Sequence, residues 1–501
     1  MLEAIRKIMV LAAAVVMPFL CAAPAAHASS VRPVRSVQAG GSEVVSQPNG
    51  SAVSTQKAKK VNLSVYSVLQ STDYSPVLDD NEWTYKTMSR NITLHIYGDK
   101  AFSSLYLKFE LPNEWMVTLP DGTGLEGGKN EFIHEWLPLG QSVKNVDLSL
   151  AKNTKLTDIY AFTDGELPSW VQVWQPPCEN ADLMVMPTHS DDEHLWFGGA
   201  MPYYAGERGY KVQVVYMTNH RQYTIRCHEQ LNGLWAVGVT HYPIISDTFR
   251  DVPATGRYDK AAEIFGYDNV LGFQVEMLRR FRPKVIIAHD INGEYGHGAH
   301  RLNARTLLEA LELTDDPAAF PESAAKYGTC QVQKVYLHLW EEHPIVMDWS
   351  KMELSRFGGK TAMDMAKKGF ACHVSQQGHY RVAEDGPYDC RKFGLAYTTV
   401  GWDTPDQNDM FEHVVWSEGR PDAEDEPSGA VAVSSSDGAV SASDTPPAAT
   451  HRQMAWIAAV SAVVVLAAAS VWMLHRKGRR GNALPSDNPT DIITVKERRK
   501  K

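Results

Sequence analysis

The chain lacks an excess of positive charge and lacks closely paired cysteines. Its 501 residues carry 49 Lys and Arg against 59 Asp and Glu, a formal net charge of −10. A nucleic-acid-binding protein would present a basic face, so this balance argues against that class. The six cysteines include no Cys-x-x-Cys pair, which argues against a cysteine zinc knuckle. Apolar residues make up 44% and charged residues 22%, as in an ordinary globular protein.

Residues 1–28 have the pattern of a secretory signal peptide. Arg6 and Lys7 precede an apolar run, and the segment closes on Ala26 and Ala28. Small residues at these two positions mark a cleavage site, so we predict export and cleavage. The five cysteines that remain allow at most two bridges and leave one thiol over. We expect some of them to be buried as apolar residues, with one candidate bridge between Cys372 and Cys390.

A second apolar run, residues 454–474, has no charged residue. As a helix it would be about 31 Å long, enough for one membrane span. A basic cluster follows directly, and residues 475–501 are therefore predicted to be a cytoplasmic tail by the positive-inside rule. A buried core helix is the alternative, which the basic cluster disfavours. Residues 418–450, rich in Ser, Ala, Pro, Asp and Glu, predict a disordered linker before the span. The sequence thus predicts a single-pass cell-membrane protein whose preceding domains are extracellular.

Residues 61–157 have the texture of an antiparallel β domain. Short β-branched and aromatic runs, among them 92–97 and 104–109, alternate with Gly- and Pro-containing turns. Several such strands in series predict a β-sandwich. Residues 29–60 have no sustained pattern and predict a flexible leader. The aromatic residues of this domain are expected mainly in its core, with a sugar-binding face as the alternative; they include Trp83, Tyr85, Trp115 and Trp136.

Residues 181–417 change to an α/β pattern, after a hinge at residues 158–180 whose two tryptophans are expected to pack against a neighbouring domain. Short apolar runs alternate with segments of helical spacing, which is typical of buried parallel strands joined by helices. The sequence therefore predicts a Rossmann-like, open and mostly parallel sheet. In such a sheet, ligands bind beyond the carboxyl ends of the strands. The runs lie at residues 181–186, 211–217, 285–288 and 334–340. Helices are predicted at residues 197–209, 227–237, 260–280 and 301–313, the third with interruptions near Gly266 and Gly272.

Two of these runs are followed by side chains that bind metals. The first run leads to His189, Asp191 and Asp192, and the third leads to His297 and His300. Two imidazoles and one carboxylate from separate loops make a three-ligand zinc site with an open position, the arrangement of catalytic zinc. Histidines and aspartates are also common in loops, but two such clusters at two strand ends favour a metal site.

These motifs carry a family resemblance. HSDDE at residues 189–193, with Phe197-Gly-Gly199 and a later YGHGAH at residues 295–300, resembles the PIG-L/LmbE-like zinc N-deacetylases, whose motifs are usually HPDDE and HPDH. The resemblance extends over residues 181–339, with serine and Gly-Ala in place of the usual proline and Pro-Asp. It implies a Rossmann-like fold, bound Zn²⁺, and a ligand set of His189, Asp192 and His300.

The resemblance also implies roles for the neighbouring side chains. Asp191 would be the general base, and His297 would stabilise the oxyanion with help from Tyr295. Arg226, in an R-x-x-E pair with Glu229, would contact a sugar substrate; the alternative for this pair is an i, i+3 salt bridge within a helix. Asp251 is a weaker candidate for a substrate contact.

The remaining acidic and histidine side chains of this region receive no catalytic role from the sequence. Glu193 is expected to cap the start of a helix. Four histidines lack partner spacing and are expected on the surface or in the core: His194, His220, His241 and His373.

The expected function is removal of an N-acetyl group from an N-acetylglucosamine-type glycan or glycoconjugate at the outer face of the membrane. One alternative is an amidase acting on a non-sugar N-acyl compound. Another is a surface protein that binds carbohydrate without catalysis. Retention of all three ligand types and of the candidate base argues against that last alternative.

Overall fold

The fold was taken from a computed structural model, in which residues 56–69 and 73–417 are described. The predicted signal peptide, acidic linker, membrane span and cytoplasmic tail lie outside these ranges. Within them, every helix is too short or too polar to cross a bilayer.

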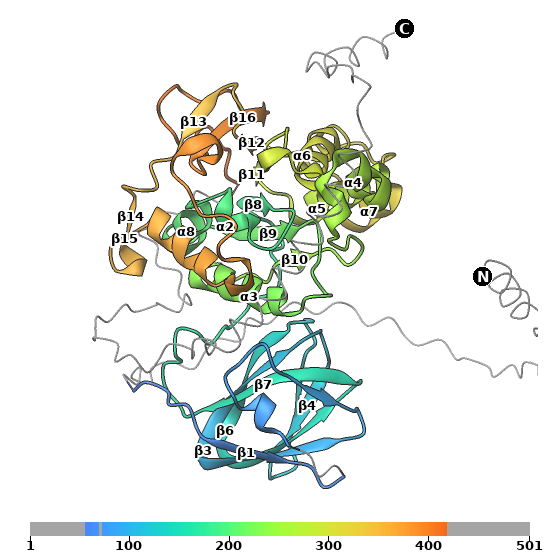
Figure 1. The fold of residues 1–501 in the computed structure, drawn as a ribbon, viewed down its shortest axis with the longest axis vertical. Coiled ribbons are helices and arrows are strands. Elements are labelled where there is room, and N and C mark those ends of the chain that lie inside the picture. The colour runs from blue at the N-terminus through green and yellow to red at the C-terminus, as the bar shows by residue number, and fades with distance from the viewer. Residues whose placement is uncertain (1–55, 70–72, 418–501) are drawn as a thin grey trace, which may run out of the picture. The chain divides into compact units, whose positions relative to one another are not determined.

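The first domain is built from seven antiparallel strands, as the turn-rich texture predicts (Figure 1, blue to teal). Hydrogen bonds join them in the order β2-β7-β3-β6-β4-β5, with β1 also paired to β3. The predicted strands at 92–97 and 104–109 are one long strand whose register shifts between Tyr97 and Ser104. Antiparallel pairing is thus observed, while a two-layer sandwich stays a prediction. The strands are β1 (Leu63–Tyr66), β2 (Lys86–Met88), β3 (Thr93–Phe109), β4 (Trp115–Thr118), β5 (Gly124–Gly127), β6 (His134–Leu150) and β7 (Thr154–Phe162).

The edges of this domain differ from the predicted boundaries. Lys57 and Lys60 form bridges with Glu166 and Phe162, so the end of the predicted leader pairs with the β domain. Strand β7 continues to Phe162, past residue 157. Of the aromatic residues predicted for the core, Trp115 is buried there, whereas Trp83 and Tyr85 are exposed.

The hinge tryptophans pack as expected, each against a different neighbour. The Trp170 ring lies 5.0 Å from that of Tyr160 in β7. The Trp174 ring lies 5.3 Å from Trp235 and 5.5 Å from Tyr242. These contacts hold the hinge segment between ordered side chains.

The second domain contains a seven-stranded sheet in the order β10-β9-β8-β11-β12-β16-β13. The first five strands are parallel to one another, and β16 pairs antiparallel with both β12 and β13. The mostly parallel prediction is therefore confirmed, and the order reverses between β8 and β11, as in doubly wound folds. The strands are β8 (Leu183–Met186), β9 (Val212–Tyr216), β10 (Ile244–Ile245), β11 (Val285–Ala288), β12 (Lys334–His338), β13 (Pro344–Val346) and β16 (Lys392–Thr398).

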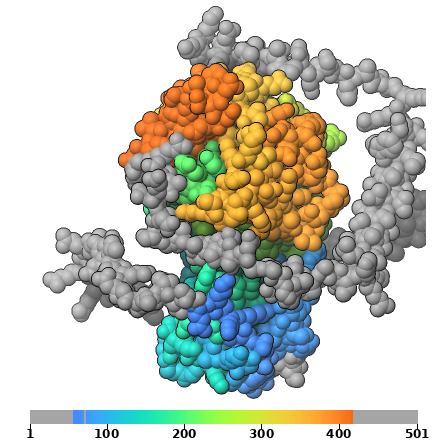
Figure 2. All heavy atoms as spheres, turned by 90° about the vertical axis from the view of Figure 1, so that its left-hand side faces the viewer, coloured from blue at the N-terminus to red at the C-terminus, as the bar shows by residue number. Residues whose placement is uncertain are grey.

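Helices connect and flank these strands (Figure 1). The break expected near Gly266 is present, because this glycine has φ 76° between α4 and α5, whereas α5 continues through Gly272. On the face drawn in Figure 2, the segment after β12, in orange, forms much of the surface of this domain. The helices are α2 (Asp192–Leu195), α3 (Ile225–Ala236), α4 (Tyr258–Phe265), α5 (Tyr267–Phe281), α6 (Gly298–Leu311), α7 (Pro321–Tyr327) and α8 (Ala362–Ala371). A short hairpin, β14 (Glu353–Leu354) and β15 (Lys360–Thr361), precedes α8.

The helix predicted from Phe197 to Gly209 is wrong in its extent. Only a six-residue π-helical turn, Pro202–Glu207, forms there, after the short α2. Gly198 explains the interruption, since it has φ 49° and a Cβ at this position would lie 2.6 Å from the Trp349 ring. The chain turns at this glycine because only glycine fits both the backbone angle and the space.

The candidate bridge between Cys372 and Cys390 is also wrong, because the five cysteines of the described residues are free thiols. The Cys390 sulfur packs against Gly198, and the Cys372 thiol donates to the carbonyl of Lys368 at 3.6 Å. The two side chains therefore serve separate packing sites.

Candidate active site

The predicted metal ligands follow β8 and β11, which are neighbours in the sheet although about a hundred residues separate them. The loop after β8 carries His189 and Asp192, and the segment after β11 carries His300 at the start of α6. A hydrogen bond of 2.9 Å from the backbone N–H of Thr188 to His289 Nε2 joins the two loops. This place, where the strand order reverses, is where open α/β sheets bind ligands.

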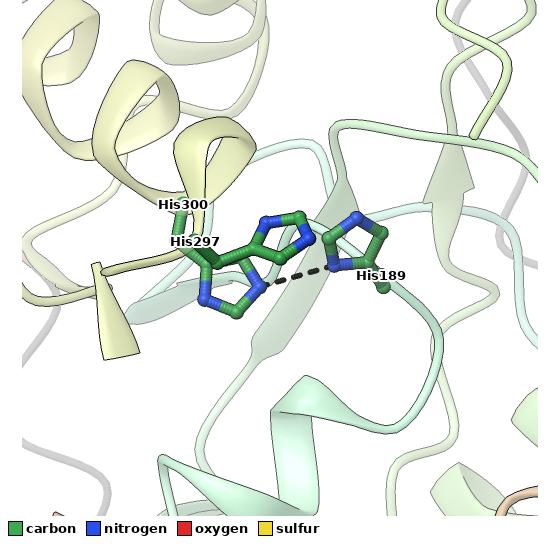
Figure 3. A group of neighbouring side chains, drawn as sticks. All are labelled: His189, His297 and His300. Atoms are coloured by element: carbon green, nitrogen blue, oxygen red, sulfur yellow. Dashed lines mark hydrogen bonds between the residues drawn. The ribbon is translucent and has the colours of Figure 1, made fainter. Parts of the chain in front are cut away.

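Three side-chain atoms form a near-equilateral triangle at the site. His189 Nδ1 lies 3.1 Å from His300 Nε2 and 3.1 Å from Asp192 Oδ2, and the last two atoms are 3.3 Å apart. Figure 3 shows both rings with these nitrogens turned toward one another. Tetrahedral ligands bound to zinc at about 2.0 Å are separated by about 3.3 Å. The residues present therefore fit a zinc ion.

The carboxylate of Asp192 is fixed at both oxygens. Oδ2 accepts the backbone N–H of His189 at 2.6 Å, and Oδ1 accepts the indole N–H of Trp196 at 2.8 Å. Burial alone would raise the pKa of this carboxyl, but His300 and His189 hold it well below its usual range. Asp192 is thus an anion in position to bind a cation.

Asp191 differs from its neighbour in backbone and in charge state. It precedes α2 with φ 116°, a rare conformation for a residue other than glycine. Burial, together with the adjacent Asp192, raises its pKa to about 7, although Arg226 acts in the opposite direction. The Arg226 Nη2 atom lies 3.4 Å from Asp191 Oδ1. A carboxyl group that titrates near neutral pH is suited to general base catalysis.

His297 and Tyr295 lie beside the triangle. The ring of His297 is 4.9 Å from that of His189 and 4.5 Å from that of His300, as Figure 3 illustrates. Burial and the two neighbouring imidazoles lower the pKa of His297 to about 2, so its ring is neutral and carries one N–H. Its Nδ1 atom is buried with no hydrogen-bond partner among the described residues. Tyr295 packs edge-on against His297 at 5.5 Å.

The sequence did not assign the buried carboxylate that supports this site. Glu294 Oε2 lies 2.8 Å from His300 Nδ1 and 2.8 Å from His289 Nδ1, and its Oε1 lies 2.7 Å from His338 Nδ1. A carboxylate on the second ring nitrogen orients a metal-binding histidine and raises its basicity. Two signals were present in the sequence: Glu294 directly precedes the YGHGAH motif, and His289 directly follows the apolar run at residues 285–288.

Glu294→Gln is expected to weaken zinc binding about 10–100-fold, because the amide cannot hold the His300 ring as an anion does. Competition with a zinc-chelating dye measures this change. Asp290→Asn is the matched control, since Asp290 lies in the same loop and accepts from the backbone of Asn292. Equal affinity in Glu294→Gln and the control would contradict a supporting role for Glu294.

Two predicted substrate contacts lie at the edge of the site. Arg226 donates to the carbonyl of Ser190 and faces Asp191. Asp251 Oδ1 lies 3.5 Å from His189 Nε2, the ring nitrogen that points away from the triangle. The alternative of an intrahelical salt bridge between Arg226 and Glu229 is wrong, because Glu229 instead accepts two hydrogen bonds of 2.6 Å from Ser375.

Relatives of the chain are found among named deacetylases, although no family model matches it. Over 175 residues it is 30% identical to a 1D-myo-inositol 2-acetamido-2-deoxy-alpha-D-glucopyranoside deacetylase of Catenulispora acidiphila, a match that covers 30% of this chain and 54% of that protein. Over 70 residues it is 40% identical to mycothiol S-conjugate amidase of Streptomyces coelicolor, covering 14% of this chain and 23% of that protein. Over these segments the chain is similar to PIG-L/LmbE-like deacetylases.

The chain spans about half of the length of the deacetylase that it matches. Among solved structures, the N,N'-diacetylchitobiose deacetylase of Pyrococcus horikoshii aligns with 40% of this chain and 73% of its own, at 18% identity and a TM-score of 0.31. A similarity of this size supports no conclusion about substrate.

A hollow of about 460 Å³ lies beside the site. Trp196, whose indole binds Asp192, forms part of its wall. Tyr380, also in the wall, stacks on Tyr295 with the ring centres 5.0 Å apart. Most of the lining comes from residues 378–388, which lie beyond the segment of motif resemblance. The hollow is therefore aromatic on the side that adjoins the triangle.

Proposed function

We propose that the chain is a zinc-dependent N-deacetylase that removes acetyl from an N-acetylglucosamine-type glycan or glycoconjugate. The observation that carries this proposal is the triangle of His189, Asp192 and His300, with Asp191 beside it. The proposal is supported by the relative from Catenulispora acidiphila, which is named for a 2-acetamido-2-deoxy-glucopyranoside substrate.

The side chains divide the work of amide hydrolysis. Zinc, when bound, polarises the amide carbonyl and lowers the pKa of a water. Asp191 accepts the proton from the attacking water as the carbon–oxygen bond forms. It then delivers that proton to the amide nitrogen as the carbon–nitrogen bond breaks, which releases acetate and the free amine. The N–H of neutral His297 donates to the carbonyl oxygen as negative charge develops there, and the Tyr295 hydroxyl is the second donor.

The surroundings suit a sugar ring. Aromatic faces bind the apolar faces of pyranoses while leaving the hydroxyl groups free for polar contacts. Trp196, Tyr380 and Tyr388 line the hollow next to the triangle, and Arg226 and Asp251 offer polar groups at the edge. We therefore assign the hollow to the sugar and its attached group, with Arg226 and Asp251 as its polar contacts.

The competing function is hydrolysis of a non-sugar N-acyl compound. The similarity to a protein named as an S-conjugate amidase supports this alternative. The test is acetate release by the purified chain from N-acetylated sugars, wall fragments and non-sugar N-acetyl amides. The proposal expects turnover on the first two groups at least about ten-fold above that on the amides, a difference of about 1.4 kcal/mol in transition-state binding. Faster release from the non-sugar amides would overturn the substrate class. Sugar binding with no release from any compound would favour a non-catalytic lectin-type role.

We further propose that the enzyme faces outward from a membrane that it spans once. The support is the signal-like residues 1–28 and the charge-free run 454–474 with the basic cluster after it. Protease added to intact cells is expected to digest an epitope tag placed before residue 418 and to spare one placed after residue 480. Cells made permeable serve as the control, in which both tags are lost. Survival of the first tag on intact cells would contradict this topology.

A further inference from the structure

A second group of metal-binding side chains lies in the interior, outside the triangle already described. Glu193 and His194 belong to α2, and His373 follows α8. All three side chains have 0% exposure. Each offers a ligand atom within 4.8 Å of the other two. Glu193 Oε1 is the common neighbour, 3.1 Å from His373 Nε2 and 3.6 Å from His194 Nε2.

These atoms are without hydrogen bonds in the described part of the chain. Both ring nitrogens of His194, both of His373, and Oε1 of Glu193 have no hydrogen-bond partner there. The 3.1 Å approach of His373 to Glu193 is therefore an ion-pair distance without hydrogen-bond geometry. Buried polar atoms are nearly always paired, because leaving one unpaired costs about 1–3 kcal/mol. Five such atoms in one place point to a missing partner.

Another candidate group, formed by residues before β2, in β6 and in α3, has most of its polar atoms paired. It contains Glu82, His134 and His228. There, Glu82 accepts from Lys108 at 2.6 Å, and His134 is hydrogen-bonded on both ring nitrogens, to Gln172 and to His228. Only His228 Nε2 of that group has no hydrogen-bond partner among the described residues, and it lies 3.5 Å from Glu110 Oε1. The Glu193 group, with five such atoms, therefore has the stronger need for an ion.

Two helix glycines pack their backbones closely against these two imidazoles. A Cβ on Gly233 in α3 would lie 2.7 Å from His194 Nε2 and 3.0 Å from His373 Nε2. A Cβ on Gly369 in α8 would lie 2.6 Å from His194 Nδ1. Glycine inside a helix costs about 1 kcal/mol relative to alanine, so both helices accept a cost where their backbones pass the two imidazoles.

We propose that Glu193, His194 and His373 bind a second divalent cation, Zn²⁺ by the nature of its donors. Two imidazoles and a carboxylate are zinc ligands, and their spacings of 3.1 and 3.6 Å are close to the separation of about 3.3 Å in tetrahedral sites. Because the group has no solvent exposure, the ion is structural and joins α2 to the segment after α8.

The test is zinc content of the purified full-length chain after dialysis against a zinc buffer. About two ions per chain are expected, and about one in His373→Gln or His194→Gln, because each loses a ligand. Gly233→Ala is expected to lose the same ion, since the new methyl group would fill the space before both nitrogens. His241→Gln, which removes a histidine whose Nδ1 is hydrogen-bonded to the Pro176 carbonyl at 2.8 Å, is the matched control and should keep both ions. One ion in the wild type and in His373→Gln, with none in His300→Ala, would overturn the second site and leave the proposed function intact.

A measurement on the unaltered chain covers the case in which these variants do not fold. Crystals grown with zinc are expected to give an anomalous difference peak among Glu193, His194 and His373, apart from the peak at His189, Asp192 and His300. A peak at the second position alone would leave the inference standing and contradict the proposed catalytic ligands. A peak at the catalytic position alone would overturn the inference and establish the Glu193–His373 contact as a metal-free buried ion pair.

Discussion

Asp191→Asn is expected to lower turnover about 10²–10⁴-fold, the usual contribution of general base catalysis, and to leave zinc binding nearly unchanged. The amide keeps the shape of the side chain but has no basic lone pair. The structural reason is the separation of tasks between two adjacent carboxylates. Asp192 Oδ2 lies within 3.3 Å of both candidate histidine ligands, whereas Asp191 faces Arg226. Turnover and zinc content measured on the same preparation test both parts.

Asp192→Asn is the matched comparison and should behave in the opposite way. Removal of the anion weakens zinc binding, and excess zinc should restore part of the activity. The pH dependence gives a second readout. Since burial raises the pKa of Asp191 to about 7, the base form is lost as the pH falls through that value, and a bound cation shifts this loss to lower pH. The wild-type rate should fall on the acid side, and the residual rate of Asp191→Asn should not follow the same curve. Loss of zinc from Asp191→Asn instead would mean that the two roles are exchanged.

His300→Ala is expected to abolish zinc binding at the His189–Asp192–His300 site and to reduce turnover to the background rate. His300 Nε2 is one of three converging donors, and its other nitrogen is held by Glu294 at 2.8 Å. Removing a ligand should therefore cost more than the about 10–100-fold loss of affinity expected for a supporting carboxylate. Elemental analysis should find one ion per chain fewer than in the wild type.

His241→Gln is again the control for this substitution, because it removes an imidazole from the same domain without touching the triangle. His189→Ala should repeat the result of His300→Ala from the other strand end. Unchanged zinc content in both alanine variants would contradict the proposed ligands, whatever their activity.

The elements that carry the triangle were predictable because their signals are local. The runs that became β8, β9, β11 and β12 are short and largely apolar, and buried parallel strands require little else. The motif around His189 was visible as a contiguous stretch. Glu294 was not assigned a role, because its three histidine partners lie at positions 289, 300 and 338, which share no period and meet only after folding.

Other errors have a similar origin. The strand β16 (Lys392–Thr398) was not predicted, because it lies in a region where aromatic residues and polar loop residues are mixed, and its place is set by pairing with β12 and β13. The predicted helix over residues 197–209 followed its apolar content, but the conformation of Gly198 and the adjacent Trp349 ring override that tendency. Likewise, His194 and His373 lack any spacing signal because 179 positions separate them. Their meeting depends on the packing of α2 near α8.

The distance along the chain between the ligands has a consequence for folding kinetics. His189 and His300 are 111 positions apart and meet only when β8 and β11 pair in parallel. Bringing together two chain positions this far apart has an entropic cost that grows with the logarithm of their separation. The chain must meet this cost before both rings can bind the same ion. Zinc therefore does not take part in the folding nucleus and binds only after the sheet has formed. Added zinc should leave the refolding rate of the chain nearly constant and should slow its unfolding, since interactions absent from the transition state act on unfolding alone.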